Sequence, residues 1–346
     1  MQMDIKNGIK CVVWDLDNTI WNGVLSEGDD VALNPRIKEI LEQLDQRGIL
    51  QSIASKNNYD DAMRKLKEFE IDRYFLYPQI HWEPKSKSVG IIQQSINIGM
   101  DTLLFIDDQP FELDEVKSVH DSINCVHVDQ YTELLSHPSL TPAFITEDSK
   151  KRREMYLQDI QRKQEEESFT GTNEEFLKTL DMKFIISEAQ EDCLKRAEEL
   201  TVRTNQLNST GRIYSYDELN YFRNSHDHKL FVCELTDKYG SYGKIGIALV
   251  EITETHWHIK LLIMSCRVIS RGVGTVLLTH IMQQAQLANK RLLADFKNTE
   301  RNKMMYVSYR FSNFKEVSKE EDGFVILEND LTQIQKFPPY INVLVQ

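Results

Sequence analysis

Apolar segments of strand length alternate with amphipathic segments of helix length between residues 9 and 127 of this sequence. Such alternation predicts a parallel sheet with helices on both faces, an α/β doubly wound fold. Ligands of these sheets bind outside the carboxyl ends of the strands, so we expect functional side chains there. Strands are predicted at residues 9–14, 49–54, 75–77, 102–106 and 125–127, and helices at residues 35–47, 59–69, 85–97 and through Val116.

Polar side chains directly follow several of the predicted strands: Asp15 and Asp17, Ser55, and Asp107 and Asp108. Like charges ~4 Å apart repel strongly, so carboxylates gathered at one sheet edge require a cation. Carboxylate oxygens suit Mg²⁺, and beside a metal one carboxylate can act as nucleophile and another as general acid/base. A single aspartate here is often only a turn residue or helix cap. The set of strand ends together favours a magnesium site for phosphoryl transfer.

Further polar residues extend this candidate site. Ser55, Lys56 and Asn57 lie between a predicted strand and a predicted helix, where a hydroxyl and backbone N–H groups can hold phosphate oxygens. The same three residues also suit an ordinary helix cap. Lys85 could supply the positive charge that steadies the phosphoryl group and the nucleophile, with Lys87 as a rival. A surface lysine is the alternative for either.

The bulk properties exclude several classes of partner. The net charge is -13, from 54 acidic and 41 basic residues, which argues against general affinity for nucleic acid or anionic membranes. No apolar run approaches the ~18 residues that a membrane span needs. The five cysteines show no CxxC spacing, so we expect reduced thiols and neither a zinc site nor a disulfide framework. We therefore expect a cytoplasmic protein.

The chain is long enough for two domains with separate cores. Residues 147–168 are dense in charge and predict a solvated helix. We expect a first domain at residues 1–142, a charged helical linker at 143–176 and a second domain at 177–346. The second half predicts an antiparallel meander, then a helix and a strand, hence an α+β domain. Its predicted strands are residues 183–186, 230–235, 245–253, 256–264 and 292–296, and its helices are residues 192–202 and a segment from Gly272 through Met282.

Four short motifs resemble those of the haloacid dehalogenase (HAD) superfamily, in the order that superfamily uses. They are Asp15-Leu16-Asp17-Asn18-Thr19, Ser55, Lys85 and Asp107-Asp108. Within the superfamily, residues 17–24, 54–58, 82–86 and 105–110 resemble the FkbH-like family of polyketide and peptide biosynthesis. The match continues in Arg203-Thr204-Asn205-Gln206-Leu207-Asn208 and so covers nearly the whole chain.

This resemblance implies a role for each motif residue. Asp15 would be the nucleophile that accepts a phosphoryl group, Asp17 the general acid/base and Lys85 the stabilising cation. Mg²⁺ would be held by Asp15, Asp107, Asp108 and the backbone carbonyl of Asp17. The phosphate- and substrate-binding residues would be Thr19, Ser55, Lys56, Asn57, Arg203 and Asn205. Arg203, Asn205 and Asn208 would make family-specific contacts, and the alternative for these three is a helix C-terminal cap.

The resemblance also implies an activity. Glyceryl transferases of the family take the glyceryl group of 1,3-bisphosphoglycerate, remove its phosphate and place the unit on an acyl carrier protein. Such transfer is associated with an active-site cysteine, but Leu25 follows Val24 here and Ala54 precedes Ser55. Three possibilities stay open: direct passage to the carrier thiol, a distant cysteine, or a phosphatase-like relative with another phosphorylated small molecule. A carrier-binding module without enzymatic activity is a further alternative.

The segment between Asp17 and Ser55 is too short for a large cap, so we expect an open site that admits a carrier-bound pantetheine arm. The second half resembles the GNAT acyltransferase fold. Residues 270–278 look like its pyrophosphate loop and helix, with Arg271, Gly272 and Gly274 as acyl- or pantetheine-binding residues. Ile269 replaces the usual Gln or Arg, and a plain tight turn is the alternative. We expect a retained fold that docks a pantetheine arm or substrate.

Overall fold

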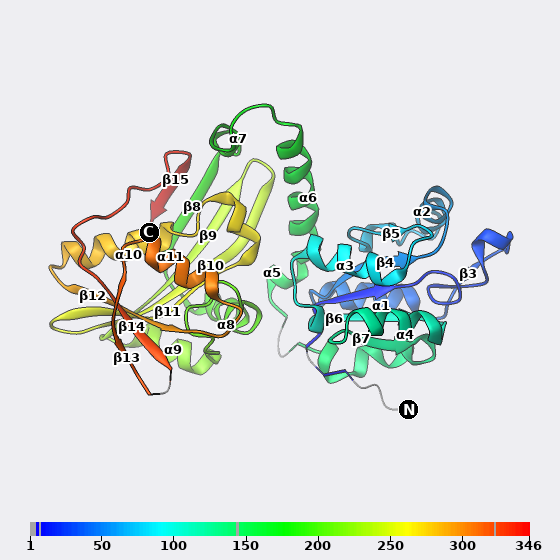
Figure 1. Ribbon diagram of the computed structural model, residues 1–346, viewed down its shortest axis with the longest axis horizontal. Helices are drawn as coiled ribbons and strands as arrows, with labels where there is room; N and C mark the ends of the chain where they lie inside the picture. Colours follow the sequence, from blue (N-terminus) through cyan, green and yellow to red (C-terminus); the bar gives the residue numbers. More distant parts are fainter. Residues whose placement is uncertain (1–4, 7, 143–144, 322) are drawn as a thin grey trace. The chain divides into compact units, whose positions relative to one another are not determined.

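The computed structural model describes residues 5, 6, 8–142, 145–321 and 323–346. The chain forms two compact units, Met1–Gln161 and Arg162–Gln346. The boundary falls inside the segment expected to be a linker, whose residues 143 and 144 lie outside the described part (Figure 1). The charged helix expected at residues 147–168 is present as α5 (Glu147–Lys150) and α6 (Arg152–Ser168).

The first unit is built on a five-stranded parallel sheet with the order β5-β4-β1-β6-β7. Its strands are β1 (Cys11–Trp14), β4 (Leu50–Ser55), β5 (Gln79–Ile80), β6 (Leu103–Asp107) and β7 (Asn124–His127). Two separate apolar clusters, one on each side of the sheet, hold the helices, which confirms the doubly wound α/β fold. The helices are α1 (Ile37–Gln46), α2 (Tyr59–Glu68), α3 (Lys85–Ile96) and α4 (Pro110–Val119).

The edge strand differs from the prediction for residues 75–77. Phe75 makes only an isolated bridge to Gln51, and the paired strand begins at Gln79. Tyr77 has φ +50° and precedes Pro78, which has no N–H to donate to a ladder. The strand therefore starts later than the apolar residues suggest.

The loop after Asp17 contains a feature that the sequence did not predict. A short hairpin, β2 (Trp21–Asn22) and β3 (Ala32–Leu33), precedes α1, with the 3-10 turn η1 (Leu25–Glu27) between its strands. Only this hairpin and α1 lie between β1 and β4. The expected minimal cap is therefore confirmed.

The second unit has an eight-stranded sheet with the order β13-β14-β12-β11-β10-β9-β8-β15. The β11–β12 and β15–β8 pairs are parallel and the others antiparallel, which confirms the α+β class. The strands are β8 (Met182–Glu188), β9 (His228–Asp237), β10 (Gly240–Ile252), β11 (His256–Met264), β12 (Arg291–Lys297), β13 (Lys315–Lys319), β14 (Phe324–Asn329) and β15 (Ile341–Val345).

Helices pack on this sheet through two apolar clusters. The helices are α7 (Asn173–Thr179), α8 (Leu194–Arg203), α9 (Tyr216–Asn224), α10 (Val276–Leu287) and α11 (Lys303–Phe311). The expected helix from Gly272 begins only at Val276, because the 3-10 segment η7 (Cys266–Arg271) ends at Gly272 with φ +67°. Among the described residues, no helix combines the length and the apolar character needed to cross a bilayer.

Candidate active site

Three aspartates meet at the carboxyl edge of the first sheet. Carboxylate oxygens of Asp15, Asp107 and Asp108 all lie within 4.8 Å of one another. The cause is the pairing of neighbouring strands: Trp14 of β1 lies opposite Ile106 of β6, so the residues that follow leave the sheet side by side. The residues Asp15 and Asp107 are 4% and 0% exposed. Two of the three clustered carboxylates are thus buried.

Among the described residues, Lys85 is the only basic side chain bonded to the carboxylates of this cluster of aspartates. It is the first residue of α3, and its Nζ donates to Asp15 Oδ1 at 2.7 Å and to Asp107 Oδ2 at 2.6 Å. Burial alone would lower the pKa of Lys85, but the two carboxylates outweigh burial and raise it. Lys87 is exposed and pairs with Glu83. The structure therefore brings Lys85, and not its rival, into the site.

The electrostatics of the cluster favour a further cation. Burial, reinforced by the charge of Asp15, raises the pKa of Asp107 from 3.8 to about 7, although Lys85 opposes the shift. Burial and Asp15 also raise the pKa of Asp108. Three carboxylates with one ammonium leave excess negative charge on hard oxygen ligands, which is the donor set that Mg²⁺ prefers. Asp15, Asp107 and Asp108 fit such an ion, whereas a contact from the backbone of Asp17 stays a prediction.

The carboxylate of Asp17 is held apart from the cluster by three donors. Its Oδ1 accepts from Trp21 Nε1 at 2.7 Å and from the Leu25 N–H at 3.1 Å. Its Oδ2 accepts from Asn57 Nδ2 at 3.0 Å. Burial raises the pKa of Asp17 in spite of these hydrogen bonds, which lower it. A carboxyl group that is oriented and more easily protonated is suited to general acid/base work.

Asn57 and Trp21 both orient the Asp17 carboxylate by donating hydrogen bonds to it. Asn57 was expected to contact phosphate, but its side-chain amide is directed to Asp17. The sequence analysis missed Trp21, which is fully buried. A tryptophan four residues after an aspartate is compatible with many folds, so the sequence carried no specific signal for it.

The other residues predicted to bind phosphate lie around the same edge. Ser55 ends β4 and is 3% exposed. Thr19 is buried, and its hydroxyl oxygen has no hydrogen-bond partner among the described residues. Lys56 donates to Glu112 Oε1 at 2.6 Å. The structure places these residues at or after the carboxyl ends of β1 and β4, and their contact with phosphate stays a prediction.

The helix that carries Lys85 is held at its N-terminus by a neighbouring helix. Pro84, the N-cap of α3, offers no side-chain hydrogen bond. Glu115 of α4 caps the helix instead, because its carboxylate accepts from the backbone N–H of Ser86 at 3.0 Å and from the Ser86 hydroxyl. The Nε2 atom of His120 lies 2.8 Å from the Ser86 carbonyl oxygen. Glu115 is therefore a positioning residue that periodicity could not identify.

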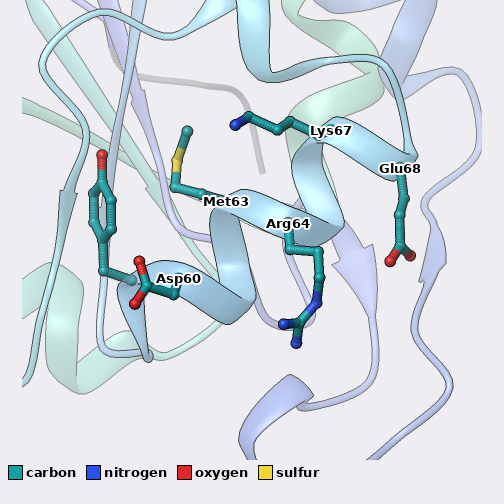
Figure 2. Close-up of a pocket in the computed structure, with 6 residues that line it drawn as sticks. Asp60, Met63, Arg64, Lys67 and Glu68 are labelled. Carbon is teal, nitrogen blue, oxygen red and sulfur yellow. The ribbon is translucent and has the colours of Figure 1, made fainter.

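A separate hollow of about 580 Å³ lies along the exposed side of α2. Figure 2 shows the Lys67 side chain extending toward Met63, whereas Arg64 and Glu68 both point downward in this view. None of its lining residues belongs to the predicted site, and Arg64 is already paired with Asp61. We assign this hollow no catalytic role. Its lining residues are Tyr59, Asp60, Met63, Arg64, Lys67 and Glu68.

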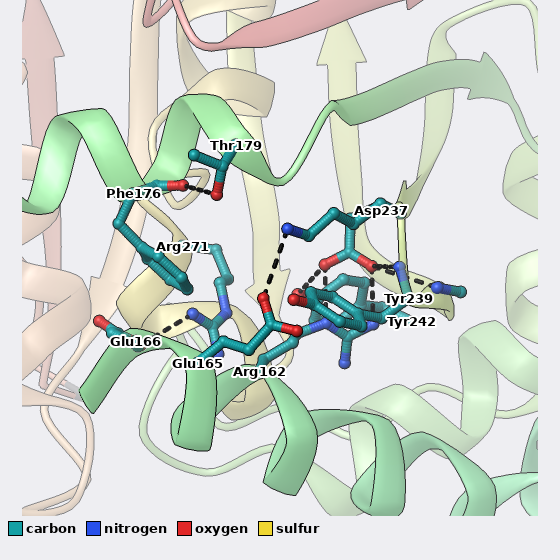
Figure 3. Close-up of polar contacts among 11 residues, drawn as sticks. Arg162, Glu165, Glu166, Phe176, Thr179, Asp237, Tyr239, Tyr242 and Arg271 are labelled. Atoms are coloured by element: carbon teal, nitrogen blue, oxygen red, sulfur yellow. Dashed lines mark hydrogen bonds and ion pairs between the residues drawn. The ribbon is translucent and has the colours of Figure 1, made fainter. Parts of the chain in front are cut away.

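The remaining predicted residues lie in the second unit. Arg203 ends α8 within 4.0 Å of Glu199, and Asn205 is exposed in the loop that follows. The Arg271 side chain is fully buried, and its Nη1 donates to Glu166 at 3.1 Å (Figure 3). A Cβ on Gly272 would collide with the Tyr340 hydroxyl.

Gly274, the last of the residues predicted to bind an acyl or pantetheine group, has a different environment. A Cβ added at Gly274 would meet no atom within 4 Å. Contact of Arg271, Gly272 or Gly274 with an acyl group stays a prediction.

Comparisons with known proteins found matches for the first unit. Residues 18–119 match the haloacid dehalogenase-like hydrolase family. A human protein, magnesium-dependent phosphatase 1, is 26% identical over 138 residues, which cover 34% of this chain and 77% of the human protein. The N-terminal part of BF1531 from Bacteroides fragilis, a phosphatase domain complexed with Mg, is 29% identical with a TM-score of 0.31. That match covers 38% of this chain and 40% of the BF1531 chain.

Acetyltransferase structures also match the chain. The ribosomal-protein-S18-alanine N-acetyltransferase of Escherichia coli is 14% identical, with a TM-score of 0.35, and the match covers 44% of this chain and 97% of that one. A GNAT-family acetyltransferase of Streptococcus pneumoniae is 17% identical, with a TM-score of 0.33 and coverage of 42% and 98%. The first unit thus contains a HAD-like hydrolase domain, and an α+β domain follows it.

Proposed function

We propose that the first domain is a Mg²⁺-dependent phosphatase that works through an aspartyl-phosphate. The observation that carries this proposal is the cluster of Asp15, Asp107 and Asp108 around Lys85, with Asp17 held separately. Mg²⁺ held by the three clustered aspartates would neutralise their charge and that of the phosphoryl oxygens. The similarity to magnesium-dependent phosphatase 1 supports the same chemistry.

Each residue of the site has a part in the proposed reaction. An Asp15 oxygen attacks phosphorus, and the bond from phosphorus to the leaving oxygen breaks. Asp17, held by Trp21 and Asn57, gives its proton to that oxygen. Asp17 then takes a proton from water as the water attacks the phosphoryl group, which releases phosphate and restores Asp15. Lys85 stays charged throughout and stabilises the negative charge on Asp15.

Phosphate release from p-nitrophenyl phosphate and a panel of phosphorylated three-carbon acids would test this proposal. We expect turnover that needs Mg²⁺, stops with EDTA and is abolished in Asp15→Asn. Asp60→Asn, a change to an exposed aspartate on α2, is the matched control and should keep full activity. Turnover that survives in Asp15→Asn would refute Asp15 as the nucleophile.

We further propose that the donor is of the 1,3-bisphosphoglycerate type and that the glyceryl unit passes to an acyl carrier protein. The sulfur of the carrier thiol attacks the acyl carbon and forms a thioester, while the bond from that carbon to the 1-phosphate oxygen breaks and the 1-phosphate leaves with the thiol proton. Asp15 accepts only the phosphoryl group of the ester at carbon 3. The likeness of residues 17–24, 54–58, 82–86 and 105–110 to the FkbH-like family supports this, as does the minimal cap. Cys11 is buried within β1, and burial raises its thiol pKa, which disfavours a thiolate there. We therefore favour direct passage to the carrier thiol.

The transfer has its own test. The full chain would be mixed with labelled 1,3-bisphosphoglycerate, Mg²⁺ and a carrier protein bearing phosphopantetheine, and the carrier would be weighed by mass spectrometry. A glyceryl adduct that is absent with apo-carrier supports transfer. Phosphate release without an adduct leaves the phosphatase alone, and carrier binding without phosphate release would support a module that only binds.

A further inference from the structure

Strands β11 and β12 of the second domain part from each other along their length. They pair in parallel only between residues 256–259 and residues 291–294. Both strands run on, β11 to Met264 and β12 to Lys297. Where two strands diverge, their facing N–H and C=O groups lose their partners, and an extended molecule with amide groups can bind there as an added strand. CoA, which a GNAT-like fold implies, carries such an amide-bearing pantetheine arm.

The gap between these strands is filled by the chain itself. Residues 207–209 lie between them, and Asn208 forms an antiparallel bridge with Ile263. On the β11 side, the Met264 N–H donates to the Leu207 carbonyl at 2.9 Å, and the Ser209 N–H donates to the Leu262 carbonyl at 2.9 Å. On the β12 side, the Lys297 N–H donates to the Ser209 carbonyl at 3.0 Å. The inserted segment, residues 207–209, thus bonds to both strands.

Buried polar side chains lock the inserted segment in place. Asn302, which is 0% exposed, donates through Nδ2 to the Asn208 carbonyl at 2.8 Å and to the Lys297 carbonyl at 2.9 Å. The Ser209 hydroxyl accepts from the Leu262 N–H at 3.0 Å. Asn208 accepts from the Thr210 N–H through Oδ1 at 3.1 Å. A ligand that entered the gap would have to break these bonds while replacing only some of them.

The loop after β11 is also occupied by groups of the same domain. Arg271 is fully buried and pairs with Glu166 of α6 (Figure 3). Arg267, the other cation of this segment, donates to the Tyr242 carbonyl at 3.0 Å. The Tyr340 hydroxyl lies against Gly272. The two cations of this loop and Gly272 are therefore engaged in contacts within the domain, whereas Gly274 is open.

We infer that residues 207–209 are a built-in strand of the second domain and close the gap between β11 and β12 to CoA and to a pantetheine arm. The domain consequently works without acetyl-CoA, and the residues here do not fit that cofactor. Any carrier arm that this protein serves is not held between these strands. The inference concerns the second domain alone and stands whether or not the first is a phosphatase.

Equilibrium dialysis of the full chain against radiolabelled acetyl-CoA tests the inference, with a CoA-binding N-acetyltransferase as positive control. We expect no saturable binding at millimolar acetyl-CoA. Hydrogen exchange followed by mass spectrometry, with and without CoA, provides a second readout. Peptides that contain residues 207–209 should exchange as slowly as those from β10, and CoA should not change them. Saturable binding, or faster exchange of residues 207–209 on adding CoA, would overturn the inference.

A variant pair tests the lock itself. Asn302→Ala removes the donor to the Asn208 carbonyl, so exchange at residues 207–209 should rise at least several-fold while β10 stays protected. Asn342→Ala, a change to an exposed residue of β15, should leave exchange there unchanged. Equal exchange in the two variants would refute the role of Asn302. The wild-type measurements are decisive even if Asn302→Ala does not fold.

Discussion

Replacement of Lys85 by methionine probes the charge balance of the site directly. The change removes two buried ion pairs, to Asp15 at 2.7 Å and to Asp107 at 2.6 Å, while keeping most of the apolar stem. Removal of one partner from a buried pair typically costs about 3–5 kcal/mol, because the remaining charges lose their compensation. We therefore expect Lys85→Met to lower the free energy of unfolding of the metal-free first domain by about that amount.

Lys87 provides the matched control for this change. It lies two residues further along α3 and forms an exposed pair with Glu83, and such surface pairs contribute about 0–1 kcal/mol. Lys87→Met should therefore unfold almost like the wild type.

Urea denaturation in EDTA, followed by tryptophan fluorescence, measures the difference. The signal reports mainly on the first unit, because Trp14, Trp21 and Trp82 lie there and Trp257 lies in the second. Added Mg²⁺ should restore part of the stability that Lys85→Met loses, since the ion would replace the missing charge. Equal unfolding free energies for the two lysine variants would refute the idea that Lys85 balances the buried carboxylates.

Three other outcomes are expected. Since the folded-state pKa of Asp107 is raised from 3.8 to about 7, its ionisation opposes folding: the metal-free protein should lose stability as pH rises through that window. Thermal unfolding in EDTA should show this loss in the wild type and not in Asp107→Asn. Trp21→Phe removes a hydrogen-bond donor to the ionised Asp17 and so raises the pKa of Asp17, which should move the Asp17-dependent limb of the pH–rate profile to higher pH. The control Trp82→Phe, at a residue that is 66% exposed, should leave the profile in place. Glu115→Ala should lower kcat roughly tenfold with little change in KM, because loss of the hydrogen bonds to Ser86 positions Lys85 less well and raises the activation free energy by about 1–1.5 kcal/mol. Equal kcat in Glu115→Ala and in the control Asp114→Ala, at an exposed residue, would contradict this role.

The carboxylate cluster was predictable because its determinants are local. Each strand is recognisable from its apolar residues, and each aspartate follows its strand directly. Parallel strands end at the same edge of a sheet, so adjacency of β1 and β6 was enough to gather Asp15, Asp107 and Asp108. The late start of β5 escaped prediction because the apolar run at residues 75–77 ends in a left-handed residue before a proline.

Other parts of the site depend on contacts between residues far apart in the chain. Lys85 and Lys87 are equivalent by composition, and only the packing of α3 buries the first and exposes the second. The amide of Asn57 has Asp17 as its partner because the loop after β4 lies beside the loop after β1. Glu115 reaches Ser86 from another helix.

The sequence by itself determined the order of strands and helices in the first domain and the carboxylates at their ends, because hydrophobic periodicity and strand-end residues are properties of short segments. The tertiary structure decided which lysine neutralises those carboxylates and which groups orient Asp17. It also decided that residues 207–209 lie between β11 and β12. The physical reason is that a hydrogen bond or ion pair between distant segments exists only once the sheet has set their separation.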